Sequence, residues 1–194
     1  MMPWWEKLMY WLGIPACLLT LALAGCEPEK RPCCPPPGKV SPFSEPPVAL
    51  PVGLRQKNYA GGSCIHASLI SVMRWQEMGQ IASWWREHYW GAEDVPGLAQ
   101  RAAKLNLRYA YTASGDPKFL EWCSATRRGA AIHYYPAHAV TFCGYQRDQA
   151  ILLDNNRVDQ LIRVPKGEFI KRWKGYGGYA LTVVYSPAPP KPWM

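Results

Sequence analysis

The chain has 194 residues, enough for one domain with appended segments, since domains commonly run to about 100–150 residues. Its 48% hydrophobic and 13% aromatic residues supply ample material for a core. The 22 Lys and Arg exceed the 14 Asp and Glu and give a net charge of +8, which favours contact with anionic surfaces. These basic residues are scattered, and apart from Arg127-Arg128 and the group Lys171, Arg172 and Lys174 there is no basic run that alternates with aromatic residues. The pattern therefore indicates a solvated basic surface and argues against a nucleic-acid groove.

Residues 1–25 have the form of a signal peptide. The apolar stretch Leu8–Ala24 is interrupted by Gly13 and Pro15, which makes it too short and too broken for a membrane-spanning helix. It runs into the tetrapeptide LAGC, which resembles the bacterial lipobox, a motif whose cysteine (here Cys26) is lipidated and becomes the new N-terminus. Acyl chains would then anchor the protein to a membrane. An uncleaved anchor and a plain secretory leader are the alternatives, and in each case we expect an exported domain, periplasmic or at the cell surface.

A proline-rich segment follows the signal peptide. Nine prolines lie between Glu27 and Pro51. Proline at this density cannot donate the hydrogen bonds of a sheet and prefers extended polyproline geometry, so the segment is expected to be a semi-rigid tether. The chain thus divides into a signal peptide (1–25), a lipidated cysteine with a tether (26–51), a folded domain (52–186) and a proline-rich tail (187–194).

The folded domain is organised around the stretch NYAGGSCIHASLISVMRW, residues 58–75, in which a glycine-rich turn leads into a helix that begins at Cys64. Gly61 and Gly62 permit a sharp turn and a close backbone approach, and Ser63 can cap the helix through its side-chain oxygen. The unpaired N–H groups of the first turn and the helix macrodipole favour a thiolate at Cys64. The following residues are apolar nearly all round, which is typical of a core helix. A cysteine in such a place can also be simply a small buried apolar residue.

The remaining elements follow from periodicity and capping residues. In chain order we expect helices over Ile81–Tyr89 and Asp94–Leu105, a strand over Leu107–Thr112, a helix from Asp116 to about Arg127, strands over Ala130–Tyr134, His138–Tyr145, Ala150–Asp154 and Gln160–Val164, a helix over Lys166–Trp173 and a strand over Tyr179–Tyr185. Helices come first and the strands of an antiparallel sheet afterwards. This order predicts an α+β domain of two lobes, with a cleft between them as the natural place for a site.

A cysteine nucleophile needs a base, and that base needs an orienting acceptor on its other ring nitrogen. His138 opens the strand HAVTFCGY, where a side chain can project into a cleft. Asp154 ends the next strand, and antiparallel pairing of the two strands would bring both residues together. Alternatively, His138 is a hydrogen-bonded buried histidine and Asp154 only forms a turn. The other histidines are less well placed: His66 points to another face of the Cys64 helix, His88 ends a helix and His133 lies within a strand.

The seven cysteines do not predict a disulfide framework. They divide into Cys17 in the signal peptide, Cys26 at the lipidation position, Cys33 and Cys34 in the tether, and Cys64, Cys123 and Cys143 in the folded domain. Pairing of Cys123 with Cys143 is left open. No spacing of cysteines and histidines resembles a zinc site, and we expect neither a metal nor a cofactor.

The motifs NYAGGSC, HAVTFCGY and LLDNN, followed by FIKRW before the closing strand, resemble those of papain-like cysteine peptidases. The resemblance runs from about Val52 to Tyr185 and is strongest to the bacterial peptidases that process double-glycine leaders. It implies an α+β papain-like fold, in which a helical N-terminal lobe with the nucleophile helix packs on a C-terminal antiparallel sheet. It also implies a Cys64–His138–Asp154 triad, with Asn155 as the alternative orienting residue because papain itself uses an asparagine.

In papain-like enzymes a glutamine six positions before the nucleophile donates to the oxyanion. That position is Asn58 here, an amide on a shorter arm, and Gln56 is the alternative if the glycine turn loops outward. The resemblance implies a thiol hydrolase that cleaves peptide or amide bonds in a peptide or protein substrate. Together with the signal peptide and the lipobox, it predicts an exported, membrane-anchored enzyme, and we expect a monomer. The same three residues also serve cell-wall amidases and transglutaminase-like acyl transferases. A papain-like binding module without activity is the remaining alternative.

Overall fold

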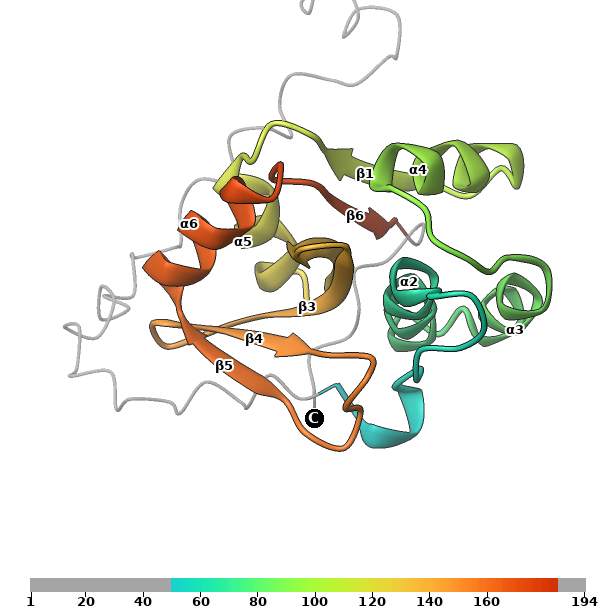
Figure 1. The fold of residues 1–194 in the computed structure, drawn as a ribbon, viewed down its shortest axis with the longest axis horizontal. Coiled ribbons are helices and arrows are strands. Elements are labelled where there is room, and N and C mark those ends of the chain that lie inside the picture. The colour runs from blue at the N-terminus through green and yellow to red at the C-terminus, as the bar shows by residue number, and fades with distance from the viewer. Residues whose placement is uncertain (1–49, 185–194) are drawn as a thin grey trace, which may run out of the picture. The chain divides into compact units, whose positions relative to one another are not determined.

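A six-stranded antiparallel sheet is the centre of the fold (Figure 1). The computed structural model describes residues 50–184, so the predicted signal peptide, Cys26, nearly all of the tether and the C-terminal tail lie outside the described residues. The strands are β1 (Tyr109–Thr112), β2 (Ala130–Tyr135), β3 (His138–Gln146), β4 (Gln149–Leu153), β5 (Ile162–Pro165) and β6 (Ala180–Val183). Their order across the sheet is β1-β6-β2-β3-β4-β5, and each neighbouring pair is antiparallel.

The helices surround this sheet. They are α2 (Cys64–Trp75), α3 (Gly79–His88), α4 (Val95–Lys104), α5 (Pro117–Ala125) and α6 (Lys166–Gly175), with a short 3-10 helix η2 (Val52–Leu54). Both predicted caps are present: Asp94 accepts from the Gly97 N–H at 2.7 Å and Asp116 from the Lys118 N–H at 3.0 Å. Within residues 50–184, no helix combines the length and the apolar character that crossing a bilayer would need.

The predicted elements from Cys64 onward are all present, and their ends differ by at most two residues from those expected. Helix ends fray and the last turn tightens, so shifts of this size are common. The helix η2 is not among the predicted elements, because a segment of three residues carries no periodic signal. The strand β1 comes from the first half of the domain yet lies at the edge of the sheet beside β6.

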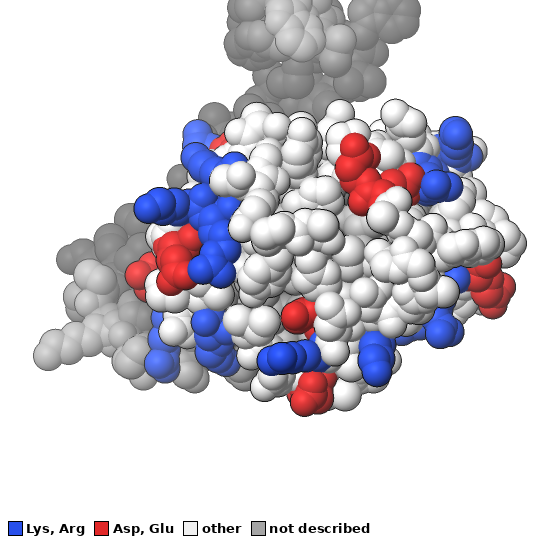
Figure 2. All heavy atoms as spheres, in the orientation of Figure 1, with Lys and Arg blue, Asp and Glu red and all other residues white. Residues whose placement is uncertain are grey.

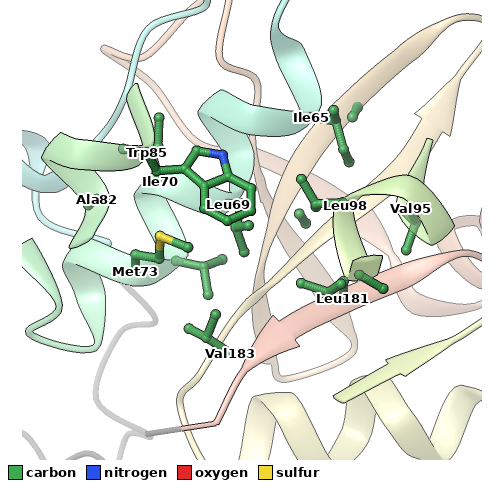
Figure 3. Close-up of a cluster of buried hydrophobic side chains, with 14 residues drawn as sticks. Ile65, Leu69, Ile70, Met73, Ala82, Trp85, Val95, Leu98, Leu181 and Val183 are labelled. Atoms are coloured by element: carbon green, nitrogen blue, oxygen red, sulfur yellow. The ribbon is translucent and has the colours of Figure 1, made fainter. Parts of the chain in front are cut away.

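The helix α2 packs against one face of the sheet together with α3 and α4. Residues 65–73 of α2 are all buried, which agrees with its apolar pattern. Figure 3 shows Leu69 and Met73 of α2 among Trp85 of α3, Leu98 of α4 and Leu181 of β6. Full burial of side chains of this size stabilises by about 1.5–3 kcal/mol each. This cluster therefore holds the start of α2 in a defined place on the sheet.

The helices α5 and α6 cover the opposite face of the sheet (Figure 1). Alternation along β2 explains how one strand serves both layers: Ala131 faces α2, whereas Ala130 and Ile132 face α5 and α6. The second lobe of the domain thus consists of the sheet with two helices behind it. The first lobe is formed by α2, α3 and α4.

The question of pairing between Cys123 and Cys143 is settled by the sheet. Cys123 on α5 belongs to the cluster behind the sheet, and Cys143 on β3 packs with Trp75 and Leu153 on the other face. Both thiols are free, and the sheet separates them. The two cysteines therefore do not form a disulfide.

Candidate active site

Two glycines shape the turn before Cys64. Gly61 and Gly62 have φ angles of 71° and 73°, in the left-handed region that a β-carbon disfavours. A β-carbon on Gly61 would also lie 3.3 Å from the Cα of Gly91, so two backbones pass very close to each other here. The turn delivers Cys64 as the first residue of α2, as the sequence predicts.

Ser63 does not cap α2, and this prediction was wrong. Its side chain makes no capping hydrogen bond. Instead, the hydroxyl donates to the Ala60 carbonyl and accepts from the Gly91 N–H at 2.8 Å. The reason is tertiary, because the loop between α3 and α4 brings a competing donor to the hydroxyl. Ser63 thus joins two loops next to the nucleophile.

The sulfur of Cys64 lies beside the start of β3. The Ala139 N–H donates to Sγ at 3.4 Å, and the His138 side chain lies close enough to Cys64 to lower the pKa of its thiol. Burial by itself would raise the pKa of Cys64, but the hydrogen bonds from His138 and Ala139 outweigh it, and the pKa is lowered. Burial raises the pKa of both Cys123 and Cys143 well above the ordinary range. Cys64 therefore has the greatest thiolate character of these three thiols.

His138 is presented to the thiol by the hairpin between β2 and β3. Pro136 and Ala137 form the turn, with Ala137 at a φ of 51°, and His138 begins the next strand. Its Nε2 donates to Asp154 Oδ1 at 2.9 Å, which leaves Nδ1 to face the thiol. The hydrogen bond with Cys64 raises the pKa of His138 most, burial opposes this, and Asp154 adds to the increase, so that the pKa is about 8.

Asp154 directly follows β4, and its predicted contact with His138 is confirmed. The register pairs Thr141 of β3 with Leu153 of β4, so His138 lies beyond the paired residues, on the side where Asp154 leaves the strand. The Asn156 N–H also donates to Asp154 Oδ1 at 2.9 Å, which fixes the carboxylate. A carboxylate can only accept, so this contact sets the tautomer and the orientation of the imidazole.

Asn155 lies elsewhere in the site. Its side chain is fully buried, and its amide nitrogen bonds groups of Cys64, Ser68 and Ala139. Among the described residues, Asp154 and not Asn155 is the partner of the His138 ring nitrogen.

The two candidate oxyanion donors are differently connected. Asn58 Nδ2 donates to Asn156 Oδ1 at 3.1 Å, which leaves a second N–H on that amide. The Asn58 backbone N–H also donates to the Asn155 carbonyl at 2.8 Å, next to Asp154 in the chain. Gln56 is buried, and its Nε2 donates to the carbonyl of its neighbour Lys57 at 2.7 Å. The connections of Asn58 thus run to the site, and the oxyanion role of either residue stays a prediction.

A pocket of about 520 Å³ opens beside Cys64 and His138. Glu93 and Asp94, from the loop before α4, form part of its wall. Figure 2 shows acidic side chains gathered over the start of α4, while basic side chains gather over α6. The pocket is large enough for several atoms of an extended chain beside the thiol.

His133, Tyr135 and Tyr176 also line this pocket, and the sequence did not single them out. His133 shares a face of β2 with Ala131, which packs under α2, so strand alternation was a signal for it. A bulge between His133 and Tyr135 breaks the alternation, and the place of Tyr135 therefore does not follow from periodicity. Burial lowers the pKa of His133, although Asp94 opposes this change.

His66 faces away from Cys64, as predicted, and lies in the core. Trp85 Nε1 donates to its Nδ1 at 3.1 Å. Its Nε2 lies 3.3 Å from Glu93 Oε2 and has no hydrogen-bond partner among residues 50–184. Burial, with the nearby Arg101, lowers the pKa of His66 to about 4, so the ring is neutral.

His88 is exposed and stacks on Trp84 at a centroid distance of 4.0 Å.

Residues 50–184 contain no group of three or more His, Cys, Asp and Glu side chains arranged to hold a metal ion. The site offers a thiol of lowered pKa, an imidazole with a pKa of about 8 and a carboxylate that accepts from this imidazole. This combination suits nucleophilic attack on a carbonyl followed by proton transfer to the leaving group.

Comparison with known proteins bears on the fold. The peptidase domain of Streptococcus ComA, a bi-functional ABC transporter involved in a quorum sensing pathway, is similar with a TM-score of 0.50 at 19% identity, over 66% of this chain and 95% of that domain. A double glycine motif protease from an AMS/PCAT transporter, solved with its leader peptide, gives a TM-score of 0.49 at 17% identity, over 66% and 87% of the two chains. No protein-family model and no curated protein matches the sequence.

The similarity to the ComA domain extends to the arrangement that the sequence predicts, with helices of the first lobe packed on an antiparallel sheet. At 19% identity the likeness concerns the fold and not the reaction. The described region has the α+β fold of papain-like peptidase domains, with Cys64 at the start of the helix that packs on the sheet.

Proposed function

We propose that this protein is an exported, membrane-anchored thiol hydrolase that cleaves peptide or amide bonds. The observation that carries the proposal is the contact of Cys64 with His138, and of His138 with Asp154 at 2.9 Å, at the wall of a pocket. The papain-like fold adds support.

Membrane attachment through a lipidated Cys26 is part of the proposal. Incorporation of a labelled fatty acid into the wild type but not into Cys26→Ser tests it.

The reaction would proceed in two stages. The Cys64 thiolate attacks the carbonyl carbon, and the oxyanion that forms accepts hydrogen bonds from the Cys64 N–H and from the Asn58 or Gln56 amide. Protonated His138 then gives its proton to the leaving amine, and the C–N bond breaks to leave a thioester on Cys64. In the second stage His138 takes a proton from water, which attacks the thioester and releases the acid. Asp154 orients the imidazole throughout and stabilises its charged form.

Selective labelling of Cys64 is the first expected result. At pH 7, iodoacetamide should alkylate Cys64 in the folded protein while Cys123 and Cys143 stay unmodified, because the pKa of Cys64 is lowered and that of the buried thiols is raised. Peptide mapping by mass spectrometry reads the three sites separately. Absence of labelling at Cys64 in native protein would contradict the proposal and favour a binding module.

The products then distinguish hydrolysis from acyl transfer. Incubation with a complex peptide mixture and a dilute primary amine should yield new free carboxyl termini if water accepts the acyl group. Amides of the added amine as the main product would instead identify an acyl transferase, which is the second outcome that the same three side chains can support.

The oxyanion donor can be assigned by two alanine variants. Because Asn58 is connected to the site and Gln56 bonds its own neighbour, Asn58→Ala should lower kcat by about a hundredfold to a thousandfold, whereas Gln56→Ala should change it little. Both variants and the wild type are compared by measuring kcat and KM on the same peptide substrate. The reverse ranking would transfer the role to Gln56.

A further inference from the structure

Asn155 occupies an unusual position beneath the candidate active site. Its side chain is completely buried, and its amide nitrogen donates to the Cys64 carbonyl at 2.9 Å, to Ser68 Oγ at 3.0 Å and to the Ala139 carbonyl at 2.9 Å. The first two groups belong to α2 and the third to β3. One side chain therefore joins the helix that carries the nucleophile to the strand that carries the histidine.

The orientation of this amide follows from its neighbours. The Cys64 and Ala139 carbonyls can only accept, so the NH₂ group of Asn155 must face them. Two N–H bonds serve three acceptors, and the amide Oδ1 is buried without a hydrogen-bond partner among the described residues. A buried acceptor without a partner lowers stability. The donors of this residue are thus in use while its acceptor is not, so its hydrogen bonds hold the side chain in place although one buried acceptor stays without a partner among the described residues.

The backbone of Asn155 makes a third connection. Its carbonyl accepts from the Asn58 N–H at 2.8 Å, and its predecessor Asp154 binds His138. The segment with the candidate oxyanion donor, the nucleophile helix and the histidine strand therefore converge on one residue.

We propose that Asn155 is a positioning residue that sets the environment of the Cys64 sulfur, an inference that rests on the proposed thiol chemistry. The link is the backbone of Ala139. Its carbonyl accepts from Asn155, and its N–H donates to Cys64 Sγ at 3.4 Å. The hydrogen bonds from the Asn155 amide to the Cys64 and Ala139 carbonyls keep this N–H and His138 directed at the sulfur. Without Asn155 the start of β3 loses one of its hydrogen-bonded connections to the first turns of α2, and the thiolate loses part of its stabilisation.

Gln76 provides a matched control on the same helix. It follows the C-terminal end of α2, is 4% exposed, and its Nε2 donates to the Arg128 carbonyl at 3.2 Å and to Thr182 Oγ1 at 3.4 Å. Like Asn155, it is a buried amide that joins α2 to the sheet. Unlike Asn155, it lies at the end of the helix remote from Cys64.

The experiment compares Asn155→Ala with Gln76→Ala in the full chain. Both should lower the melting temperature. Only Asn155→Ala should move the midpoint of Cys64 alkylation by iodoacetamide upward, by about one pH unit, as expected when a thiolate loses one charge-assisted hydrogen bond. It should also lower kcat by about tenfold to a hundredfold with little change in KM. Asn155→Ser keeps one hydrogen-bond donor, and its alkylation midpoint and kcat should lie between those of the wild type and the alanine variant.

An unchanged alkylation midpoint in both Asn155 variants, or equal shifts in Asn155→Ala and Gln76→Ala, would overturn the positioning role. The alkylation readout needs no substrate. If Cys64 is alkylated with a lowered midpoint that depends on Asn155 while no peptide is cleaved, the positioning role holds and the proposed hydrolase function fails. The two inferences are therefore distinguishable.

Discussion

Replacing Cys64 by alanine is expected to abolish hydrolysis and to leave the protein folded. The thiolate supplies the attacking electron pair, and the residues of such a unit act together, so loss of the nucleophile alone should lower kcat by about a millionfold. The side chain contributes little to the core, since Cys64 is only partly buried. The free energy of unfolding should fall by about 1 kcal/mol or less. Peptide cleavage and circular dichroism measure the two effects.

The control for this variant is Cys143→Ala. Cys143 of β3 is 1% exposed and packs against Trp75 in the core, so its truncation should lower stability and leave kcat unchanged. Cleavage by Cys64→Ala at a rate comparable with the wild type would exclude the thiol mechanism. Such a result would leave a papain-like fold without this chemistry.

Replacing His138 by glutamine is the second large effect. It removes both the base for the thiol and the acid for the leaving amine, and kcat should fall by about a thousandfold to ten-thousandfold. Because the hydrogen bond from His138 is the largest favourable influence on the thiolate, the pKa of Cys64 should also rise toward that of an ordinary cysteine. Measurements of kcat and of the alkylation midpoint separate these two consequences.

The pH dependence follows from the same pair. The rate should rise as Cys64 ionises, at a pH below the pKa of an ordinary cysteine, and fall as His138 loses its proton, since the pKa of His138 is about 8.

The pH dependence of stability follows from His138 alone. In the folded state the pKa of His138 is above the ordinary value of 6.5, so its protonated form stabilises the fold. This stabilisation is fully present below about pH 6.5 and is lost as the pH rises through about 8. His138→Gln should remove it.

His88→Gln serves as the control, because His88 ends α3, is exposed, stacks on Trp84 and is not among the residues that line the pocket. Its kcat and its alkylation midpoint should stay close to those of the wild type. An equal loss of activity in both variants would mean that His138 has no special role. That outcome would contradict the assignment of the base.

Much of the fold was accessible from the sequence because its signals are local. Asp94 and Asp116 predicted where two helices begin, since a side-chain cap acts within one turn. The change from helical to alternating periodicity predicted the strands from Ala130 onward. The contact between His138 and Asp154 was also predictable, because two adjacent antiparallel strands joined by a short turn leave little freedom of register.

Other features depend on segments that are distant in the chain. Ser63 has the residue type of a cap, but the approach of Gly91 gives its hydroxyl another partner. Asn155 looked like a possible partner of His138, yet its neighbour Asp154 holds that place, and packing directs the Asn155 amide beneath Cys64. The bulge after His133 decides which side chains line the pocket, and no periodic signal announces it.

By itself, the sequence determined the kinds and order of the elements and the places of Cys64, His138 and Asp154 at element ends, because capping and periodicity act over a few neighbouring residues. Only the tertiary structure decided that Cys123 and Cys143 lie on opposite faces of one sheet. It alone also decided that Asn155 joins the nucleophile helix to the histidine strand. A donor can bond only an acceptor within about 3 Å, and the packing of segments that are distant in the chain determines which acceptors come that close.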